Sequence, residues 1–236
     1  MKVRFYATLE QAEKDALQGA AIVVIDVLRA SSTIIAALES GAERIIPIAD
    51  VATATRIVRP GDRGLKLLAG ERKARPVPGF DLCNSPSEFT PETVRGKTIV
   101  FTTTNGTRAI AASARASRVV VGALRNVSAV ADAVASGPSL VLLCCGSEGS
   151  IAAEDILCGG LLMKRLGSRV DLASVNDAGR IALFLAERFG GEVEQFVRSC
   201  EHARRLVSLG CEHDVVFCAR VDATKRVPEV RGGAIT

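Results

Sequence analysis

Three segments combine residue types that could bind and transform an anion, and the first follows an apolar run at residues 20–25. There Asp26 and Arg29 precede the hydroxyl residues Ser31 and Ser32 at the expected start of a helix. Free backbone N–H groups and the helix dipole favour an anion at such a position. The alternative is structural: the serines cap the helix, and Arg29 neutralises Asp26, whose charge is costly inside an apolar strand.

The second segment, residues 101–108, holds four threonines, an Asn-Gly pair and an arginine. Gly106 permits a positive φ, so consecutive N–H groups around Thr103 and Asn105 could form an anion-binding nest with Arg108 nearby. The structural alternative is an Asn-Gly turn followed by a threonine cap. Taken alone, this segment therefore supports both interpretations equally.

The third segment places Ser147 in a glycine-rich loop and puts Glu154 and Asp155 in the first turn of the helix that follows. These two carboxylates either complement the helix dipole or hold a divalent cation such as magnesium, which prefers hard oxygen ligands. Glu71 and Arg72 add a carboxylate and a guanidinium at the end of another apolar run. Together the segments indicate a small, multiply anionic substrate bound with a hard metal ion, as in phosphoryl transfer.

Several covalent phosphatase motifs are excluded by the sequence. Leu28 stands where an aspartyl-phosphate motif needs its second aspartate, and no cysteine is followed by arginine at the spacing of a Cys-x5-Arg loop. The chain also lacks a P-loop and an Arg-His-Gly triplet. We assign neither His202 nor His213 to catalysis, because both fall in the helical C-terminal part.

Alternating apolar and amphipathic stretches predict the elements that must position these residues. Strands are expected at residues 2–6, 21–28, 44–48, 65–70, 98–102, 118–121 and 140–145, and helices at 9–17, 31–40, 51–58, 107–116, 127–135, 152–166 and within 176–219. The segment 71–91 is rich in proline and too long for an ordinary connection. Residues 220–236 are expected to add an edge strand and a tail. This alternation predicts a mostly parallel sheet with helices on both faces and a ligand site at the carboxyl ends of its strands.

Composition indicates a single α/β domain. The chain has 236 residues with 48% hydrophobic and 24% charged residues, which suits one globular unit over residues 1–236, with a candidate helical subdomain from about residue 170. A net charge of +4 and 4% aromatic residues argue against nucleic acid as a partner. No apolar run reaches membrane-spanning length and no signal peptide is visible, so we expect a cytoplasmic protein. A homodimer is the base-rate expectation.

The three segments, together with residues 70–72 and 79–86, resemble the 2-phosphosulfolactate phosphatase (ComB) family. The resemblance covers residues 24–160, and we expect it to extend over the whole chain. It implies a magnesium-dependent acid phosphatase that converts (2R)-phospho-3-sulfolactate to 3-sulfolactate and phosphate, on a route to coenzyme M. It also implies a family-specific fold, a three-layer α/β/α arrangement with a mostly parallel, mixed sheet.

The resemblance assigns roles to residues at the matching positions. The expected catalytic residues are Asp26, Glu71 and Glu154, the metal ligands are Asp26, Glu154 and Asp155, and the substrate-binding residues are Arg29, Ser31, Ser32, Arg72, Asn84, Ser85, Thr103, Asn105, Gly106, Arg108 and Ser147. Water bound to Mg²⁺ is the expected nucleophile, because no covalent-phosphatase motif is present. Nothing in the sequence indicates an organic cofactor.

Two other functions stay open at this point. One is a phosphatase of the same family that acts on another small phosphorylated hydroxy acid. The other is a non-catalytic anion-binding protein, which would bind ligand without releasing phosphate. The carboxylates beside the arginines argue against the second, because an anion trap has no use for nearby negative charge.

Overall fold

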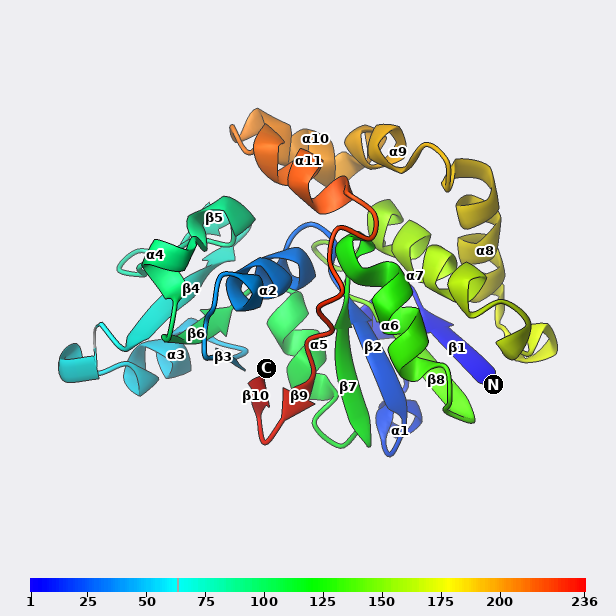
Figure 1. Ribbon diagram of the computed structural model, residues 1–236, viewed down its shortest axis with the longest axis horizontal. Coiled ribbons are helices and arrows are strands. Elements are labelled where there is room, and N and C mark those ends of the chain that lie inside the picture. The colour runs from blue at the N-terminus through cyan, green and yellow to red at the C-terminus, as the bar shows by residue number, and fades with distance from the viewer. Residues whose placement is uncertain (63) are drawn as a thin grey trace.

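The computed structural model describes residues 1–62 and 64–236 and contains two β-sheets with helices packed around them (Figure 1). The first sheet has the strand order β1-β8-β2-β7, and all of its pairs are parallel. Its strands are β1 (Lys2–Tyr6), β2 (Ala21–Ile25), β7 (Arg118–Gly122) and β8 (Ser139–Cys144). Parallel strands joined by helical crossovers agree with the predicted alternation.

The second sheet is mixed, with the strand order β5-β4-β6-β3-β10-β9. Strands β4, β6 and β3 are parallel, whereas β5 and the hairpin β9–β10 pair in the antiparallel sense. The strands are β3 (Arg44–Pro47), β4 (Lys66–Arg72), β5 (Arg75–Pro76), β6 (Thr98–Thr102), β9 (Val230–Arg231) and β10 (Ala234–Ile235).

The C-terminal hairpin lies between the two sheets. Ile235 of β10 pairs with Ile45 of β3. Glu229, the residue before β9, forms an isolated bridge with Val120 of β7. The N–H of Val121 donates to the carbonyl of Pro228 at 2.9 Å. The expectation of an edge strand after residue 220 is confirmed, because β9 is the last strand in the order of the second sheet and an isolated bridge at Glu229 connects this edge to β7.

Helices cover both faces of the first sheet, which confirms the three-layer α/β/α prediction. Side chains alternate along β2, so that Val23 and Ile25 pack with α6 (Val127–Val134) and α7 (Ala153–Leu166). Ile22 and Val24 point to the opposite face, where α2 (Ala30–Glu39) and α5 (Gly106–Ala112) lie. Every residue of this strand after Ala21 is buried, as its continuous apolar run predicts.

Helices α2 and α5 also contact the second sheet. Ile99 and Phe101 of β6 belong to the same apolar cluster as Ile34 of α2 and Ile110 of α5. The far side of the second sheet is covered by α3 (Val51–Ile57), whose buried Ala54 packs with Leu68 and Val100. In the described part of the chain, two four-residue helices, α1 (Lys14–Leu17) and α4 (Pro91–Val94), and six 3-10 turns connect these elements. The 3-10 turns span Leu9–Gln11, Pro60–Asp62, Pro86–Glu88, Leu124–Asn126, Gly167–Arg169 and Leu172–Ser174.

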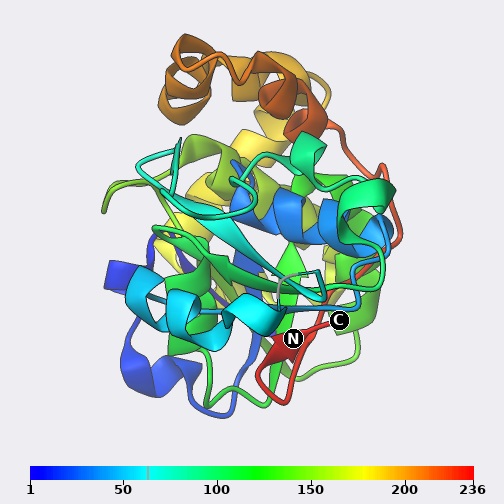
Figure 2. The same ribbon diagram turned by 90° about the vertical axis from the view of Figure 1, so that its left-hand side faces the viewer.

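Four α-helices lie between α7 and the C-terminal hairpin. They are α8 (Asp177–Phe189), α9 (Val193–Ser199), α10 (Glu201–Ser208) and α11 (Glu212–Ala219). Helix α8 packs against α7, and buried residues of α9, α10 and α11 join the apolar cluster of the first sheet. In both views α10 and α11 lie at the end of the molecule toward which the strands of the first sheet run (Figure 2). The one-domain organisation with a helical subdomain stays a prediction.

No helix in the described residues is both long enough and apolar enough to cross a lipid bilayer. The seven cysteines are free thiols, and all except Cys211 are buried.

The sequence pattern predicted the order of most strands and helices along the chain, with boundaries that differ by a few residues. Residues 9–17, predicted as one helix, form a 3-10 turn and the four-residue helix α1 instead.

Candidate active site

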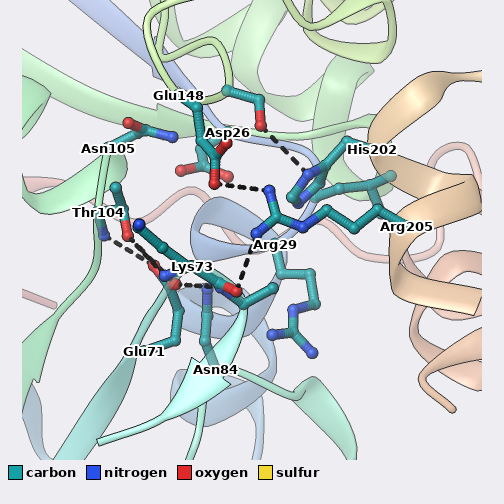
Figure 3. A pocket seen from close by; sticks show the side chains of 13 residues that line it. Asp26, Arg29, Glu71, Lys73, Asn84, Thr104, Asn105, Glu148, His202 and Arg205 are labelled. Atoms are coloured by element: carbon teal, nitrogen blue, oxygen red, sulfur yellow. Dashed lines mark hydrogen bonds and ion pairs between the residues drawn. The ribbon is translucent and has the colours of Figure 1, made fainter. Parts of the chain in front are cut away.

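One polar pocket, with an empty volume of about 400 Å³, collects the ends of strands from both sheets (Figure 3). Asp26 follows β2, Glu71 is the second-last residue of β4, Thr104 follows β6 and Ser147 follows β8. Helix α10 closes the pocket with two further side chains. Its lining consists of Asp26, Leu28, Arg29, Glu71, Lys73, Ala74, Asn84, Thr104, Asn105, Ser147, Glu148, His202 and Arg205.

Glu71 joins the loops after β4 and β6. Its Oε1 accepts the backbone N–H of Thr104 at 2.7 Å, and its Oε2 accepts the N–H of Ala74 at 2.7 Å. Strand β4 comes this close to β6 because residue 70 is glycine: a Cβ there would lie 1.9 Å from the carbonyl oxygen of Thr102. With both carboxylate oxygens bound to backbone, Glu71 holds two walls of the pocket together.

Asp26 is buried at the end of β2, and its Oδ1 accepts the N–H of Ala30 at 3.0 Å. Burial raises the pKa of Asp26 to about 7, with smaller contributions from the negative charges of Glu71 and Glu154. The positive charge of Arg29 acts in the opposite sense and more weakly on this pKa. A buried carboxylate with a raised pKa, in a pocket with other carboxylates, is a candidate for chemistry or for a cation site.

Gly106 gives Asp26 its space. A Cβ at this position would lie 2.6 Å from the Cβ of Ala30 and 2.8 Å from Oδ2 of Asp26. Gly106 begins α5 and does not have a positive φ, so the expected nest built on a left-handed glycine is wrong. The glycine is needed because two loops approach each other closely, and any larger side chain would push the Asp26 carboxylate aside.

Asp155, expected as a metal ligand, spans two other loops. Its Oδ1 accepts the N–H of Val27 at 2.8 Å, and its Oδ2 accepts the N–H of Gly146 at 3.2 Å. Burial raises the pKa of Asp155 well above its usual range, and the charges of Asp26 and Glu154 raise it further. Both oxygens therefore fix the loops after β2 and β8, which puts Asp155 behind the pocket.

Glu154 is buried and lines an adjoining cavity of about 950 Å³ of empty volume. This second cavity shares Ser147, Glu148, His202 and Arg205 with the first. Burial also raises the pKa of Glu154. The two expected acidic neighbours thus differ: Asp155 is saturated by backbone N–H groups, whereas Glu154 faces a cavity.

Arg29 does not form its ion pair with Asp26. Its Nη1 donates to Oδ2 of Asp214 at 2.6 Å, and both side chains are buried. Its Nη2 is buried and has no hydrogen-bond partner in the part of the chain that the structure describes. The same holds for Oδ1 of Asn84, which also lines the pocket. Because buried polar atoms normally have partners, both atoms indicate a ligand in this pocket.

Two more cations line the pocket, Lys73 and Arg205. Arg205 donates through Nη1 to Oε1 of Glu148 at 2.6 Å and through Nη2 to the carbonyl of Lys73 at 3.2 Å. Together with Arg29 they give the pocket three positively charged side chains against the carboxylates of Asp26, Glu71 and Glu148. This balance suits a ligand with several negative charges near a cation.

His202 stands beside Ser147, with 3.2 Å between Nδ1 and the serine Oγ. Burial lowers the pKa of His202 to about 4, and the positive charges of Arg29 and Arg205 lower it further. The imidazole is therefore neutral at physiological pH. In this state it can share a hydrogen bond with Ser147 and still bind an oxygen of a ligand.

The structure brings only part of the expected substrate-binding set to the pocket. Arg29, Asn84, Asn105 and Ser147 line it, as do the expected catalytic residues Asp26 and Glu71. The other expected substrate-binding residues, which do not line it, are Ser31, Ser32, Arg72, Ser85, Thr103, Gly106 and Arg108.

These remaining side chains have local partners. Ser31 Oγ accepts the N–H of Asp26, and Ser32 Oγ donates to the carbonyl of Val27, so neither serine caps α2. The side chain of Thr103 instead accepts the N–H of Thr107. Arg72 donates to the carbonyl of Glu71 and to Thr102, whereas Arg108 pairs with Glu10 at the surface. Their contacts order the loops that carry the pocket residues.

Sequence reasoning missed Lys73, Thr104, Glu148, His202 and Arg205. A signal was present for two of them, because residues three apart on a helix share a face, and His202 and Arg205 are so spaced. What the sequence does not reveal is that α10 folds back over the strand ends.

The donor set around Asp26 fits a magnesium ion shared with a phosphate. Mg²⁺ is usually held by one or two carboxylates together with substrate phosphates, and a cage of protein ligands is not required. Asp26 lines the pocket, and its Oδ2 receives no hydrogen bond from residues 1–62 and 64–236. Within the same residues, no group of three His, Cys, Asp or Glu side chains has a metal-binding arrangement.

Comparison with known proteins agrees with these features. The profile of the 2-phosphosulpholactate phosphatase family matches residues 6–233. A probable 2-phosphosulfolactate phosphatase of Caldanaerobacter subterraneus is 40% identical over 236 residues, which covers 100% of this chain and 98% of that protein. A protein of the same name from Symbiobacterium thermophilum is 38% identical over 220 residues, which covers 93% of this chain and 94% of that protein. Another, from Thermotoga petrophila, is 41% identical over 211 residues, which covers 89% of each chain. The chain therefore belongs to the 2-phosphosulpholactate phosphatase family, whose members are phosphoric monoester hydrolases.

Proposed function

We propose that this protein hydrolyses (2R)-phospho-3-sulfolactate to 3-sulfolactate and phosphate, with Mg²⁺ as its metal ion and on a route to coenzyme M. The observation that carries the proposal is the unpartnered Nη2 of buried Arg29 in a pocket that also holds Asp26. The printed names of the relatives support the choice of substrate. The cytoplasmic location, the homodimer and the lack of a nucleic-acid partner stay predictions.

The charges of the pocket suit this substrate, which carries a phosphate, a sulfonate and a carboxylate. Arg29, Lys73 and Arg205 supply three cations, and a guanidinium matches the planar pairs of oxygens on such groups. Nη2 of Arg29 is free to bind one oxygen of the ligand, and its position is fixed because Nη1 is held by Asp214. Asn84, whose Oδ1 lacks a partner, can accept a hydrogen bond from a hydroxyl or a water.

Hydrolysis of a phosphate ester requires little covalent chemistry from the protein, because positioning and electrostatic stabilisation lower most of the barrier. Asp26 would hold Mg²⁺ through Oδ2, and the ion would neutralise charge on the phosphate oxygens. The protein fixes this carboxylate through the N–H of Ala30. It fixes the surrounding loops through Glu71 and Asp155.

Water is the nucleophile that fits the remaining side chains. Burial raises the pKa of both Cys144 and Cys145 well above the usual value, so neither supplies a thiolate at neutral pH. The hydroxyl of Ser147 lies 3.2 Å from Nδ1 of His202, and both residues line the pocket. Both groups can therefore hold a water or a substrate oxygen beside Asp26.

The test is phosphate release by the purified protein from a panel of phosphorylated acids that includes phosphosulfolactate, phosphoglycolate and phospholactate. The proposal predicts the highest kcat/KM for phosphosulfolactate, because phospholactate lacks the sulfonate that the third cation would bind. A higher kcat/KM for another member of the panel would identify that compound as the better substrate and would still support phosphate-ester hydrolysis as the reaction. Saturable binding of phosphosulfolactate without any phosphate release would contradict the proposal.

A further inference from the structure

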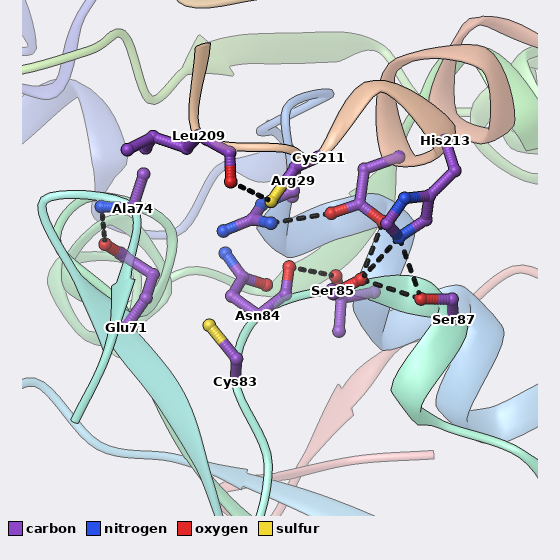
Figure 4. Close-up of polar contacts among 12 residues, drawn as sticks. Arg29, Glu71, Ala74, Cys83, Asn84, Ser85, Ser87, Leu209, Cys211 and His213 are labelled. Atoms are coloured by element: carbon purple, nitrogen blue, oxygen red, sulfur yellow. Dashed lines mark hydrogen bonds and ion pairs between the residues drawn. The ribbon is translucent and has the colours of Figure 1, made fainter. Parts of the chain in front are cut away.

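Asp214 of α11 is fully buried and forms an ion pair with the pocket residue Arg29, which Figure 4 draws together with Ser85 and His213. The two residues are 185 positions apart in the chain, and Oδ2 of Asp214 lies 2.6 Å from Nη1 of Arg29. Helix α11 lies outside every segment that points to the chemistry in the sequence. Nevertheless, it supplies the charge partner of a pocket arginine.

Asp214 is itself held in place by the segment that follows β5. The hydroxyl of Ser85 donates to Oδ1 of Asp214 at 2.7 Å, and Nε2 of His213 lies 3.1 Å from the same oxygen. Ser87 extends this contact through its own hydrogen bond with His213 at 3.1 Å. Each carboxylate oxygen therefore has a defined partner, and the carboxylate has no freedom to rotate away from Arg29.

The geometry divides the two ends of the Arg29 fork. Nη1 is bound to Asp214, whereas Nη2 is buried and has no hydrogen-bond partner in residues 1–62 and 64–236. Arg29 as a whole is 3% exposed, so water does not surround the free nitrogen. From this division we infer that Asp214 is a positioning residue: it fixes the guanidinium so that Nη2 receives an oxygen of the anionic ligand.

Stability alone is a poor explanation for this ion pair. A buried pair pays a large desolvation cost, and replacing one with apolar residues is often neutral or stabilising. A purely structural pair would also have both nitrogens bound to the protein, since an unpartnered buried donor is costly. The unfilled Nη2 beside a fixed Nη1 is the arrangement expected of a preorganised anion donor.

This inference rests on the proposed function for the identity of the ligand, but its test uses a simpler probe. The probe is inorganic phosphate, whose binding to the metal-free protein can be measured by isothermal titration calorimetry without any turnover. Asp214→Asn keeps the shape of the side chain and an acceptor for Nη1, while it removes the charge that orients Arg29. We expect phosphate to bind about tenfold more weakly, as for the loss of one charge-assisted contact.

A double-mutant cycle separates positioning from general damage. Because Asp214 acts through Arg29, Asp214→Asn is expected to change phosphate affinity less than about twofold when Arg29→Gln is already present. The double variant replaces a buried ion pair with a neutral pair, so it is expected to fold even if Arg29→Gln alone does not. An equal loss in both backgrounds would mean that Asp214 acts independently of Arg29, and would overturn the inference.

Glu229→Gln is the matched control, because Glu229 also pairs with an arginine, Arg118, at the start of β7 and far from the strand ends. It is expected to leave phosphate affinity unchanged. On phosphosulfolactate, Asp214→Asn is expected to raise KM by about the same factor as the phosphate Kd, with kcat within about twofold.

The outcomes distinguish this inference from the proposed function. If Asp214→Asn binds phosphate more weakly but the wild type does not turn over phosphosulfolactate, the proposed function is refuted and the positioning role of Asp214 is supported. If the wild type turns over phosphosulfolactate but Asp214→Asn leaves the phosphate Kd and the KM unchanged, the proposed function is supported and the positioning role is refuted. A wild-type protein that binds no phosphate would overturn the inference as well.

Discussion

Arg205 and Glu148 form a 2.6 Å ion pair that stands between two cavities, because both side chains line the polar pocket and the larger cavity beside it. Arg205 is 35% exposed and Glu148 50% exposed, so the pair is accessible to solvent. Pairs of this kind contribute little to stability. The position of the pair indicates that Glu148 competes with an anionic substrate for the guanidinium of Arg205.

Replacing Glu148 by Gln removes this competitor and one negative charge from the pocket wall. We expect KM for phosphosulfolactate to fall about two- to threefold at low ionic strength, with the difference shrinking as salt screens the charges. Initial rates at low and high ionic strength measure the effect. Glu194→Gln, which breaks an exposed pair with Arg198 on α9, is the control and should leave KM unchanged. A higher KM in Glu148→Gln would show that Glu148 assists binding.

Gly106→Ala tests the close approach of α5 to Asp26. The new Cβ would lie 2.8 Å from Oδ2 of Asp26, so we expect the carboxylate to shift and kcat/KM to fall by about 10²-fold or more. Gly137→Ala is the matched control, since its nearest neighbour would be 3.5 Å away. Steady-state kinetics beside thermal unfolding separate the two effects. Full activity in Gly106→Ala would mean that the position of Asp26 is not critical.

Glu71→Gln tests the connection between the loops that follow β4 and β6, two neighbouring strands of the second sheet. A glutamine has one oxygen for the N–H groups of Thr104 and Ala74, so one backbone donor is left without an acceptor. We expect the free energy of unfolding to fall by about 1–3 kcal/mol, measured by urea denaturation. Glu43→Gln, whose carboxylate accepts a hydroxyl of Thr98, should cost less than about 0.5 kcal/mol. Equal costs in the two variants would refute the assigned role of Glu71.

The pKa of His202, lowered to about 4 by burial and by the neighbouring arginines, predicts a pH-dependent stability. The unfolded chain binds a proton at His202 below about pH 6.5, whereas the folded protein does so only near pH 4. The contribution of neutral His202 to the free energy of unfolding is therefore fully present above pH 6.5 and is lost as the pH falls toward 4. Thermal unfolding over this range should show wild-type Tm falling relative to His202→Gln. Parallel Tm curves for the two proteins would contradict the half-buried, neutral imidazole.

Much of the fold follows from residue patterns that act over short distances. The buried run of β2 and the polar residues directly after it predict a strand and a loop, and the structure has both. Parallel pairing then places Asp26 and Ser147 at one edge of the first sheet. The division into two sheets was not predictable, because the hairpin at residues 230–235 pairs with strands far away in the sequence.

The sequence was less informative about which polar residues face the pocket. Arg108 lies in the first turn of α5 and Asn105 directly precedes this helix, yet Asn105 lines the pocket and Arg108 pairs with Glu10 at the surface. The direction in which each side chain points from the start of α5 decides this difference, and residue composition does not predict that direction. Asp214 and His202 enter the site through the packing of α10 and α11 over the strand ends, a tertiary contact without a local signal.

The most direct test of the account compares the wild type with Asp26→Asn after treatment with EDTA, with and without added Mg²⁺. Phosphate release from phosphosulfolactate is the readout, and circular dichroism confirms that both proteins are folded. The account predicts Mg²⁺-dependent release by the wild type and a loss of about 10³-fold or more in Asp26→Asn, because the free Oδ2 in the pocket is replaced. Full Mg²⁺-dependent turnover by Asp26→Asn would contradict it.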